Sequence, residues 1–118
     1  GDNLAQETRQ YSADTPLAGG GALKRLALQW NARKGCSLIH ELGKPRGALL
    51  AGLCKATGAD GVINCLMKFC DPEEYDYPIY KEEVEAASVP MLYLEIDQQL
   101  TSFEQIRTRV QSFTEMLL

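Results

Sequence analysis

Four cysteines are the residues of this chain best suited to chemistry: Cys36, Cys54, Cys65 and Cys70. A thiolate is a nucleophile or a soft metal ligand, so each position is a candidate for covalent catalysis or for metal binding. Their spacings of 18, 11 and 5 residues match neither a CxxC pair nor a zinc ribbon, and the chain has one histidine, His40. A self-contained zinc site is therefore not expected.

Cys70 is set apart from the other cysteines by its neighbours. The apolar run that ends at Met67 predicts a strand, and Asp71-Pro72 predicts the start of a helix. Cys70 then lies at the carboxyl end of a predicted parallel strand, the edge where open α/β sheets bind ligands. The positive end of the helix dipole favours an anionic thiolate there. The alternative interpretation is an inert, partly buried thiol at a strand end.

The other sulfur and imidazole groups have simpler interpretations. Cys54 and Cys65 lie in apolar runs, and we expect them to pack in the core as reduced thiols. Cys36 is interpreted as a plain loop or surface cysteine. A dyad of His40 with Cys70 would indicate a cysteine-dependent hydrolase. Because nothing in the spacing brings these two residues together, His40 is interpreted as a solvent-facing or capping residue.

Composition excludes several classes of partner. The 118 residues are 45% apolar and 24% charged, typical of one globular domain with a core. The twelve basic residues are scattered in a chain of net charge −4, so nucleic-acid binding is not expected. No apolar run approaches the ~20 residues of a membrane span, and the start GDNLAQETRQY is too polar for a signal peptide. We predict a cytoplasmic protein without a membrane or nucleic-acid partner.

Apolar periodicity predicts two helices and a strand in the first part of the chain. The first helix has Leu23 and Trp30 on one apolar face, and Gly58 is expected to cap the second helix at its C-terminus. The strand is apolar enough to be buried on both faces of a sheet. The predicted elements are a helix from about Gly21 to Arg33, a loop from Lys34 to Lys44, a helix that ends near Thr57, and the strand Val62–Met67.

A helix, a strand and a final helix are predicted after Cys70. The third helix starts near Asp71, and Pro78 is expected to divide an initial turn from its main part. A second buried strand is expected over Met91–Ile96. Thr101 and Glu104 predict a capping box for the last helix, whose apolar residues recur at spacings of three and four up to Leu117.

This order of elements predicts an α/β fold. We expect a Rossmann-like or flavodoxin-like three-layer domain with a small parallel sheet and flanking helices. Residues 1–118 are interpreted as a single domain, with a helical and loop lead-in over 1–43 and a helix-strand-helix-strand-helix core over 44–118. Two strands are few for such a sheet, so we interpret the chain as the C-terminal part of a larger subunit or as a domain that borrows sheet edges from its neighbours.

The chain also resembles a known family, most specifically from Gly58 onward. The resemblance rests on CDPEEYDYP from Cys70 to Pro78, on PMLYLEIDQQ from Pro90 to Gln99, and on RTR and FTEML in the last predicted helix. These segments look like the C-terminal domain of the 2-hydroxyacyl-CoA dehydratase and benzoyl-CoA reductase family. The order of elements matches over roughly the whole chain.

The resemblance implies a subunit of an enzyme complex. In that family two related subunits each hold a cysteine-bound 4Fe–4S cluster, and a separate ATP-dependent iron–sulfur activator passes in one electron. Dehydratase members form a ketyl radical that expels the hydroxyl group of an (R)-2-hydroxyacyl-CoA. The implied partners are a second homologous dehydratase subunit, the activator and an acyl-CoA substrate. The alternatives are a benzoyl-CoA reductase subunit, which dearomatises its substrate, and a non-catalytic interaction domain.

By the same resemblance, Cys70 falls on the cysteine of the FCDP-type motif that is a cluster ligand in the family. The other ligands belong to parts of the subunit that lie outside this chain, so the isolated chain is expected to bind no cluster and to be inactive. No catalytic residue is assigned. Five residues at the same predicted sheet edge are candidates for contact with the cluster or the acyl-CoA, with solvated or capping roles as the alternative: Lys68, Asp71, Glu95, Asp97 and Gln98.

Overall fold

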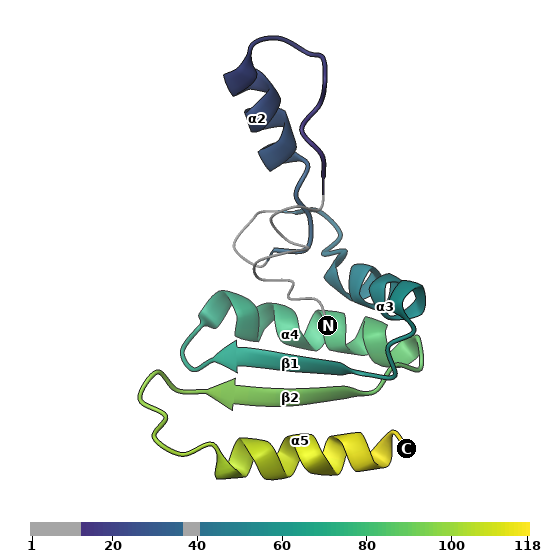
Figure 1. Cartoon of the computed structure of the whole chain (residues 1–118), viewed down its shortest axis with the longest axis vertical. Coiled ribbons are helices and arrows are strands. Elements are labelled where there is room, and N and C mark those ends of the chain that lie inside the picture. The colour runs from purple at the N-terminus through teal and green to yellow at the C-terminus, as the bar shows by residue number, and fades with distance from the viewer. Residues whose placement is uncertain (1–12, 37–40) are drawn as a thin grey trace. The chain divides into compact units, whose positions relative to one another are not determined.

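A computed structural model describes residues 13–36 and 41–118, and this part of the chain contains four helices and two strands (Figure 1). The predicted α/β fold is confirmed. The elements follow the predicted order: α2 (Ala22–Asn31), α3 (Arg46–Thr57), β1 (Val62–Met67), α4 (Asp71–Ala86), β2 (Met91–Ile96) and α5 (Glu104–Met116). None of these helices is both long and apolar enough to cross a membrane.

The chain divides into two compact units, Gly1–Pro45 and Arg46–Leu118. The first unit contains α2, which forms where the sequence predicts a helix. Its predicted apolar face is exposed, with Leu23 at 83% and Trp30 at 59%. The side chain of Gln29 links the helix to the preceding segment, because its amide donates a hydrogen bond of 2.9 Å to the carbonyl of Ala13. No residue of α2 is buried, and this polar contact links α2 to the segment before it.

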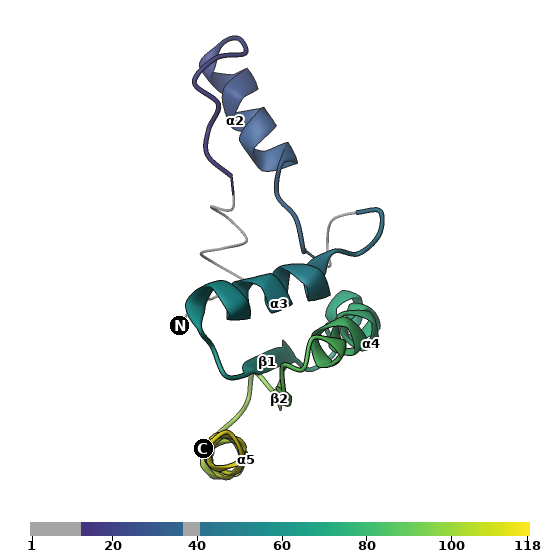
Figure 2. The same ribbon diagram turned by 90° about the vertical axis from the view of Figure 1, so that its right-hand side faces the viewer.

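The second unit has a parallel sheet between two helices. β1 and β2 pair in register from Val62 opposite Met91 to Met67 opposite Ile96. The views along and across the strands place α4 and α5 on opposite faces of this sheet (Figure 2). Because the two strands are parallel, their carboxyl ends and the residues that follow them meet at one edge.

Most of the core lies between α3, α4 and the sheet, with a smaller part beneath α5. The ring of Tyr77 on α4 lies 4.7 Å from the ring of Tyr93, so Tyr93 points toward α4. Because side chains alternate along a strand, its neighbour Leu94 points toward α5, and Leu94 is only 3% exposed. The buried apolar residues of this unit are Leu50, Cys54, Leu66, Tyr80, Val84, Leu94 and Phe113.

β1 is buried on one face only, so the prediction of burial on both faces is wrong. Asn64 and Leu66, at 8% and 3% exposure, lie on the face that α4 covers. On the opposite face Ile63, Cys65 and Met67 are exposed. The physical reason is that α5 packs against β2, and no described element buries this face of β1.

Two predicted helix details are also corrected. α4 runs without a break from Asp71 to Ala86, with Pro78 inside it. Pro78 is exposed, so water can bond the carbonyl that loses its helical N–H partner. The capping box of Thr101 and Glu104 does not form: α5 begins at Glu104, whose N–H lies 3.5 Å from the hydroxyl of Ser102 instead.

Candidate functional site at the carboxyl edge of the sheet

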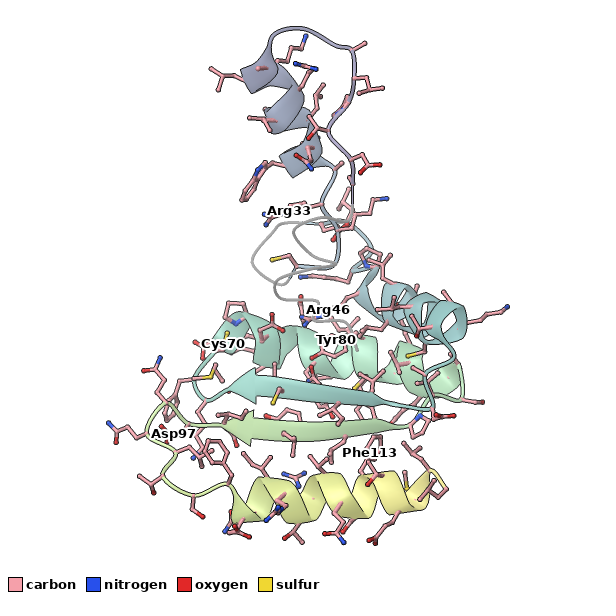
Figure 3. The ribbon with its side chains drawn as sticks, viewed as in Figure 1. Arg33, Arg46, Cys70, Tyr80, Asp97 and Phe113 are labelled. Atoms are coloured by element: carbon pink, nitrogen blue, oxygen red, sulfur yellow. The ribbon has the colours of Figure 1, made fainter. Side chains whose placement is uncertain are left out.

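Cys70 lies between β1 and α4, at the edge toward which both strands run (Figure 3). It is half-buried and is itself the residue before the first turn of α4, one position earlier than the predicted cap at Asp71. Its carbonyl accepts hydrogen bonds from the N–H groups of Glu73 and Glu74, each at 3.0 Å. The helix therefore fixes the backbone of Cys70 and directs the positive end of its dipole to this residue.

The turn between β1 and Cys70 is strained at Phe69. Phe69 has φ of 65°, in the left-handed region that side chains other than glycine seldom adopt. The N–H of Cys70 donates to the carbonyl of Met67 at 3.2 Å, which closes the turn. The side chain of Phe69 is 89% exposed, so packing of this aromatic ring within the described chain does not offset the strain. Such strain is typical of turns that position a functional group.

Two of the predicted flanking residues, Lys68 and Asp97, meet at this edge. The Lys68 ammonium lies 3.6 Å from an Asp97 carboxylate oxygen, and both side chains are more than 40% exposed. Because solvent screens the pair, it contributes only about 0–1 kcal/mol. Asp97 also accepts a hydrogen bond of 3.0 Å from the N–H of Gln99. Asp97 therefore stabilises a local turn and also lies at the candidate site.

Asp71, Glu95 and Gln98 are exposed: Asp71 begins α4, Glu95 lies in β2 and Gln98 follows β2. Glu95 is opposite Leu66, on the face of the sheet that α4 covers. Burial, and then the negative charge of Glu95, raise the pKa of Tyr93. The carboxylate of Glu95 thus disfavours ionisation of the neighbouring Tyr93 phenol.

All four cysteines are free thiols, as predicted, but their burial differs from the prediction at two positions. Cys54 is buried on α3, which confirms a core role. Cys65 is exposed on the open face of β1, so its predicted core role is wrong for this chain; partial desolvation by the strand still raises the pKa of its thiol. Cys36 lies in a loop but is buried at 6% exposure. His40 lies outside the described residues.

A partly buried ion pair close to Cys70 could not be predicted from the sequence. The guanidinium of Arg46, at the start of α3, pairs with the carboxylate of Glu73 in the first turn of α4, and each side chain is 15% exposed. The same guanidinium lies 4.6 Å from the ring centre of Tyr80 (Figure 3). In the sequence, Glu73 is one of several carboxylates in the first turn of a predicted helix, where a favourable interaction with the helix dipole is a simpler interpretation than a catalytic pair. The partner is 27 residues away, and only tertiary packing brings it close.

Tyr80 and Asn64 continue this cluster into the core. They are 1% and 8% exposed, and among the described residues neither the Tyr80 hydroxyl nor the Asn64 side-chain nitrogen has a hydrogen-bond partner of good geometry. Burial raises the pKa of Tyr80 from 10.0 to about 12, although the charge of Arg46 and the nearby Asn64 amide oppose the rise. The phenol is therefore neutral at physiological pH and supports the packing of α4.

Glu73→Gln is expected to lower the free energy of unfolding by about 2–3 kcal/mol, because it removes the negative charge that pairs with Arg46 in a largely buried setting. The neighbouring Glu74→Gln is the matched control, since Glu74 is exposed and should change stability by less than about 0.5 kcal/mol. Urea unfolding of both variants measures the difference. Equal effects would show that the buried pair adds nothing beyond the dipole interaction shared by both carboxylates.

At this edge of the sheet the described residues can supply one ligand to a metal centre and do not form a complete metal site. In the described part of the chain, no group of three or more histidine, cysteine, aspartate or glutamate side chains is arranged to hold a metal ion. Cys70 supplies one half-buried thiol at a helix start. Such a thiol can serve as one ligand of a centre whose other ligands come from elsewhere.

The sequence matches one protein family along nearly its whole length. The family is described as HGD-D, 2-hydroxyglutaryl-CoA dehydratase, D-component, and the match covers residues 1–117. The chain belongs to this family. The match includes the turn at Cys70 and confirms the resemblance predicted from the CDPEEYDYP and PMLYLEIDQQ segments.

Three curated relatives are similar to this chain. It is 49% identical over 116 residues to the lactoyl-CoA dehydratase subunit beta of Anaerotignum propionicum and 44% identical over 117 residues to the (R)-phenyllactyl-CoA dehydratase beta subunit of Clostridium sporogenes. It is 34% identical over 119 residues to the (R)-2-hydroxyglutaryl-CoA dehydratase subunit beta of Acidaminococcus fermentans. The matches cover 98–99% of this chain but only 31% of each relative.

Proposed function

We propose that this chain is part of a 2-hydroxyacyl-CoA dehydratase subunit and that Cys70 supplies one ligand to its 4Fe–4S cluster. The observation that carries the proposal is the position of Cys70, a half-buried thiol at the start of α4 and at the carboxyl edge of the sheet. The three relatives described above are named as dehydratase beta subunits, which favours a dehydratase over a dearomatising reductase. The proposed substrate class is an (R)-2-hydroxyacyl-CoA.

This chain can supply one of the several ligands that the proposed cluster needs. Cys54 is buried within α3 and Cys65 lies on an open strand face, so neither joins Cys70 at the sheet edge. The chain spans 31% of the length of its relatives, and the remaining part of such a subunit is the proposed source of the other ligands.

When bound, the cluster would supply an electron at low potential, so that the substrate forms a ketyl radical and loses its hydroxyl group as water. The residues of this chain would hold the ligand in place. The dipole of α4 stabilises negative charge at Cys70. The Arg46–Glu73 pair fixes the first turn of that helix, and Lys68 with Asp97 joins the two strand ends beside it. We further propose a second homologous subunit, an ATP-dependent activator and a cytoplasmic location.

The proposal predicts that the 118-residue chain alone binds no stable cluster, because a single thiolate cannot hold four iron atoms. After anaerobic reconstitution with iron and sulfide, absorption and electron paramagnetic resonance spectra of the chain should lack a stoichiometric 4Fe–4S signal. The full-length subunit that contains it, treated identically, should show that signal. A stoichiometric cluster on the isolated chain would contradict the proposed sharing of ligands between this chain and the rest of the subunit.

A further inference from the structure

We infer that the open face of β1 is covered, in the full-length subunit, by another segment of the same polypeptide. This face consists of Ile63, Cys65 and Met67, called the β1 strip below. The inference rests on the proposed function only in that this chain is part of a longer subunit, and it is independent of any metal bound at Cys70.

The β1 strip exposes apolar side chains where a parallel sheet normally buries them. Ile63 is 47% exposed and Met67 is 41% exposed, with Cys65 exposed between them. Parallel strands are almost always covered on both faces, and five of the six residues of β1 are apolar, as such strands require. A single exposed apolar residue would need no explanation, but three successive ones on one strand face form a continuous surface.

The backbone N–H groups of the same three residues also lack a strand partner within the described part of the chain. The N–H groups of Val62 and Lys68 donate to carbonyls of the β2 side, each at 2.9 Å. Because amide directions alternate along a strand, the residues of the β1 strip direct their N–H groups away from β2. Within the described residues the sheet consists of β1 and β2 alone, so that edge has no strand partner. A two-stranded sheet is marginal without further packing.

A segment of the same polypeptide is a better occupant than a separate molecule. Stable association of two proteins buries about 1,200–2,000 Å² in total, far more than three side chains supply. A segment of the same chain is held at high effective concentration, so that a small apolar surface is sufficient. The relatives contain about two-thirds of their length beyond the part that this chain matches. The adjacent strand β2 is already covered in this way, by α5 of its own chain.

Alkylation of Cys65 by N-ethylmaleimide tests the inference directly. In the 118-residue chain Cys65 should react readily, whereas in the full-length subunit without any partner its rate should fall at least about tenfold. Peptide mass spectrometry distinguishes it from the other cysteines. Cys54, which is 7% exposed, is the control and should react slowly in both proteins. Rapid reaction of Cys65 in the folded full-length subunit overturns the inference.

Two other outcomes also overturn it. Protection of Cys65 that appears only after the second subunit is added assigns the β1 strip to a contact between subunits. Protection that grows with the concentration of the 118-residue chain assigns the strip to a second copy of this chain.

A pair of variants of the full-length subunit tests the inference even if the short chain does not fold. Ile63→Thr replaces a residue of the β1 strip, and Ile79→Thr replaces an isoleucine of similar exposure, 44%, on α4. Threonine retains the β-branch, so neither change disturbs local backbone preference strongly. Ile63→Thr should lower the midpoint of thermal unfolding by about 2–5 °C more than Ile79→Thr does. Equal shifts, or a larger shift for Ile79→Thr, contradict a covered β1 strip.

Discussion

In the proposed two-subunit enzyme, Cys70→Ser is expected to abolish turnover and to weaken or change the proposed iron–sulfur cluster. The reason is chemical: the serine hydroxyl is hard and stays protonated at neutral pH, whereas iron in a sulfide cluster prefers a soft thiolate. Subunit association should persist, because it depends on surface spread over many residues. Turnover, iron content, electron paramagnetic resonance spectra and gel filtration of the same preparation measure these effects separately.

The same substitution at Cys65 is the matched control for Cys70→Ser. Cys65 lies five residues earlier, inside β1 and not at the sheet edge, so Cys65→Ser should retain both iron and turnover. A Cys70→Ser enzyme with near-normal dehydration and iron content would exclude Cys70 as a ligand. An enzyme that no longer assembles would make Cys70 a structural residue, and the proposed function would then depend on family membership alone.

The strands could be predicted from local sequence, whereas their surroundings could not. The bounds of β1 and β2 follow from apolar runs that begin after Gly61 and Pro90, and the structure reproduces both strands. The burial of each strand face depends on elements distant in sequence. The apolar neighbours of Cys65 therefore predict a core position, although Cys65 is exposed in the described structure.

The candidate site was predictable only where it depends on local order. A strand followed at once by an Asp-Pro helix start places Cys70 at the sheet edge, and the end of the second strand brings Asp97 there. The pair of Arg46 and Glu73 could not be predicted, because neither residue has a local pattern that identifies the other. Its detection requires the packing of α3 against α4.

Tyr80→Ala is expected to lower the free energy of unfolding by about 3–5 kcal/mol, which is the usual cost of removing a buried aromatic side chain. Tyr80 is 1% exposed, and its ring lies 5.5 Å from that of Tyr77 in an edge-to-face arrangement. The guanidinium of Arg46 lies over the face of this ring. The substitution would therefore leave a cavity and remove support from the Arg46–Glu73 pair.

Urea unfolding of Tyr80→Ala should be compared with that of Tyr75→Ala and Tyr80→Phe. Tyr75 is on the same helix and is 79% exposed, so Tyr75→Ala should cost less than about 0.5 kcal/mol. Tyr80→Phe keeps the ring and removes a hydroxyl that has no hydrogen-bond partner of good geometry among residues 13–36 and 41–118, so its cost should stay below about 1 kcal/mol. A phenylalanine variant as unstable as the alanine variant would assign the stabilisation to the hydroxyl and the Asn64 contact.

Tyr80→Ala should also affect the turn at Cys70, because Tyr80 supports Arg46 and Arg46 holds Glu73 in the first turn of α4. Hydrogen exchange at the amides of Glu73 and Glu74, which bond the Cys70 carbonyl, should accelerate more than exchange at the C-terminal end of α4. In Tyr80→Phe the ring remains beneath the guanidinium, and exchange at these amides should stay close to that of the unmodified chain. Uniform acceleration along α4 in the alanine variant would show that Tyr80 stabilises the helix as a whole and has no particular influence on the position of Cys70.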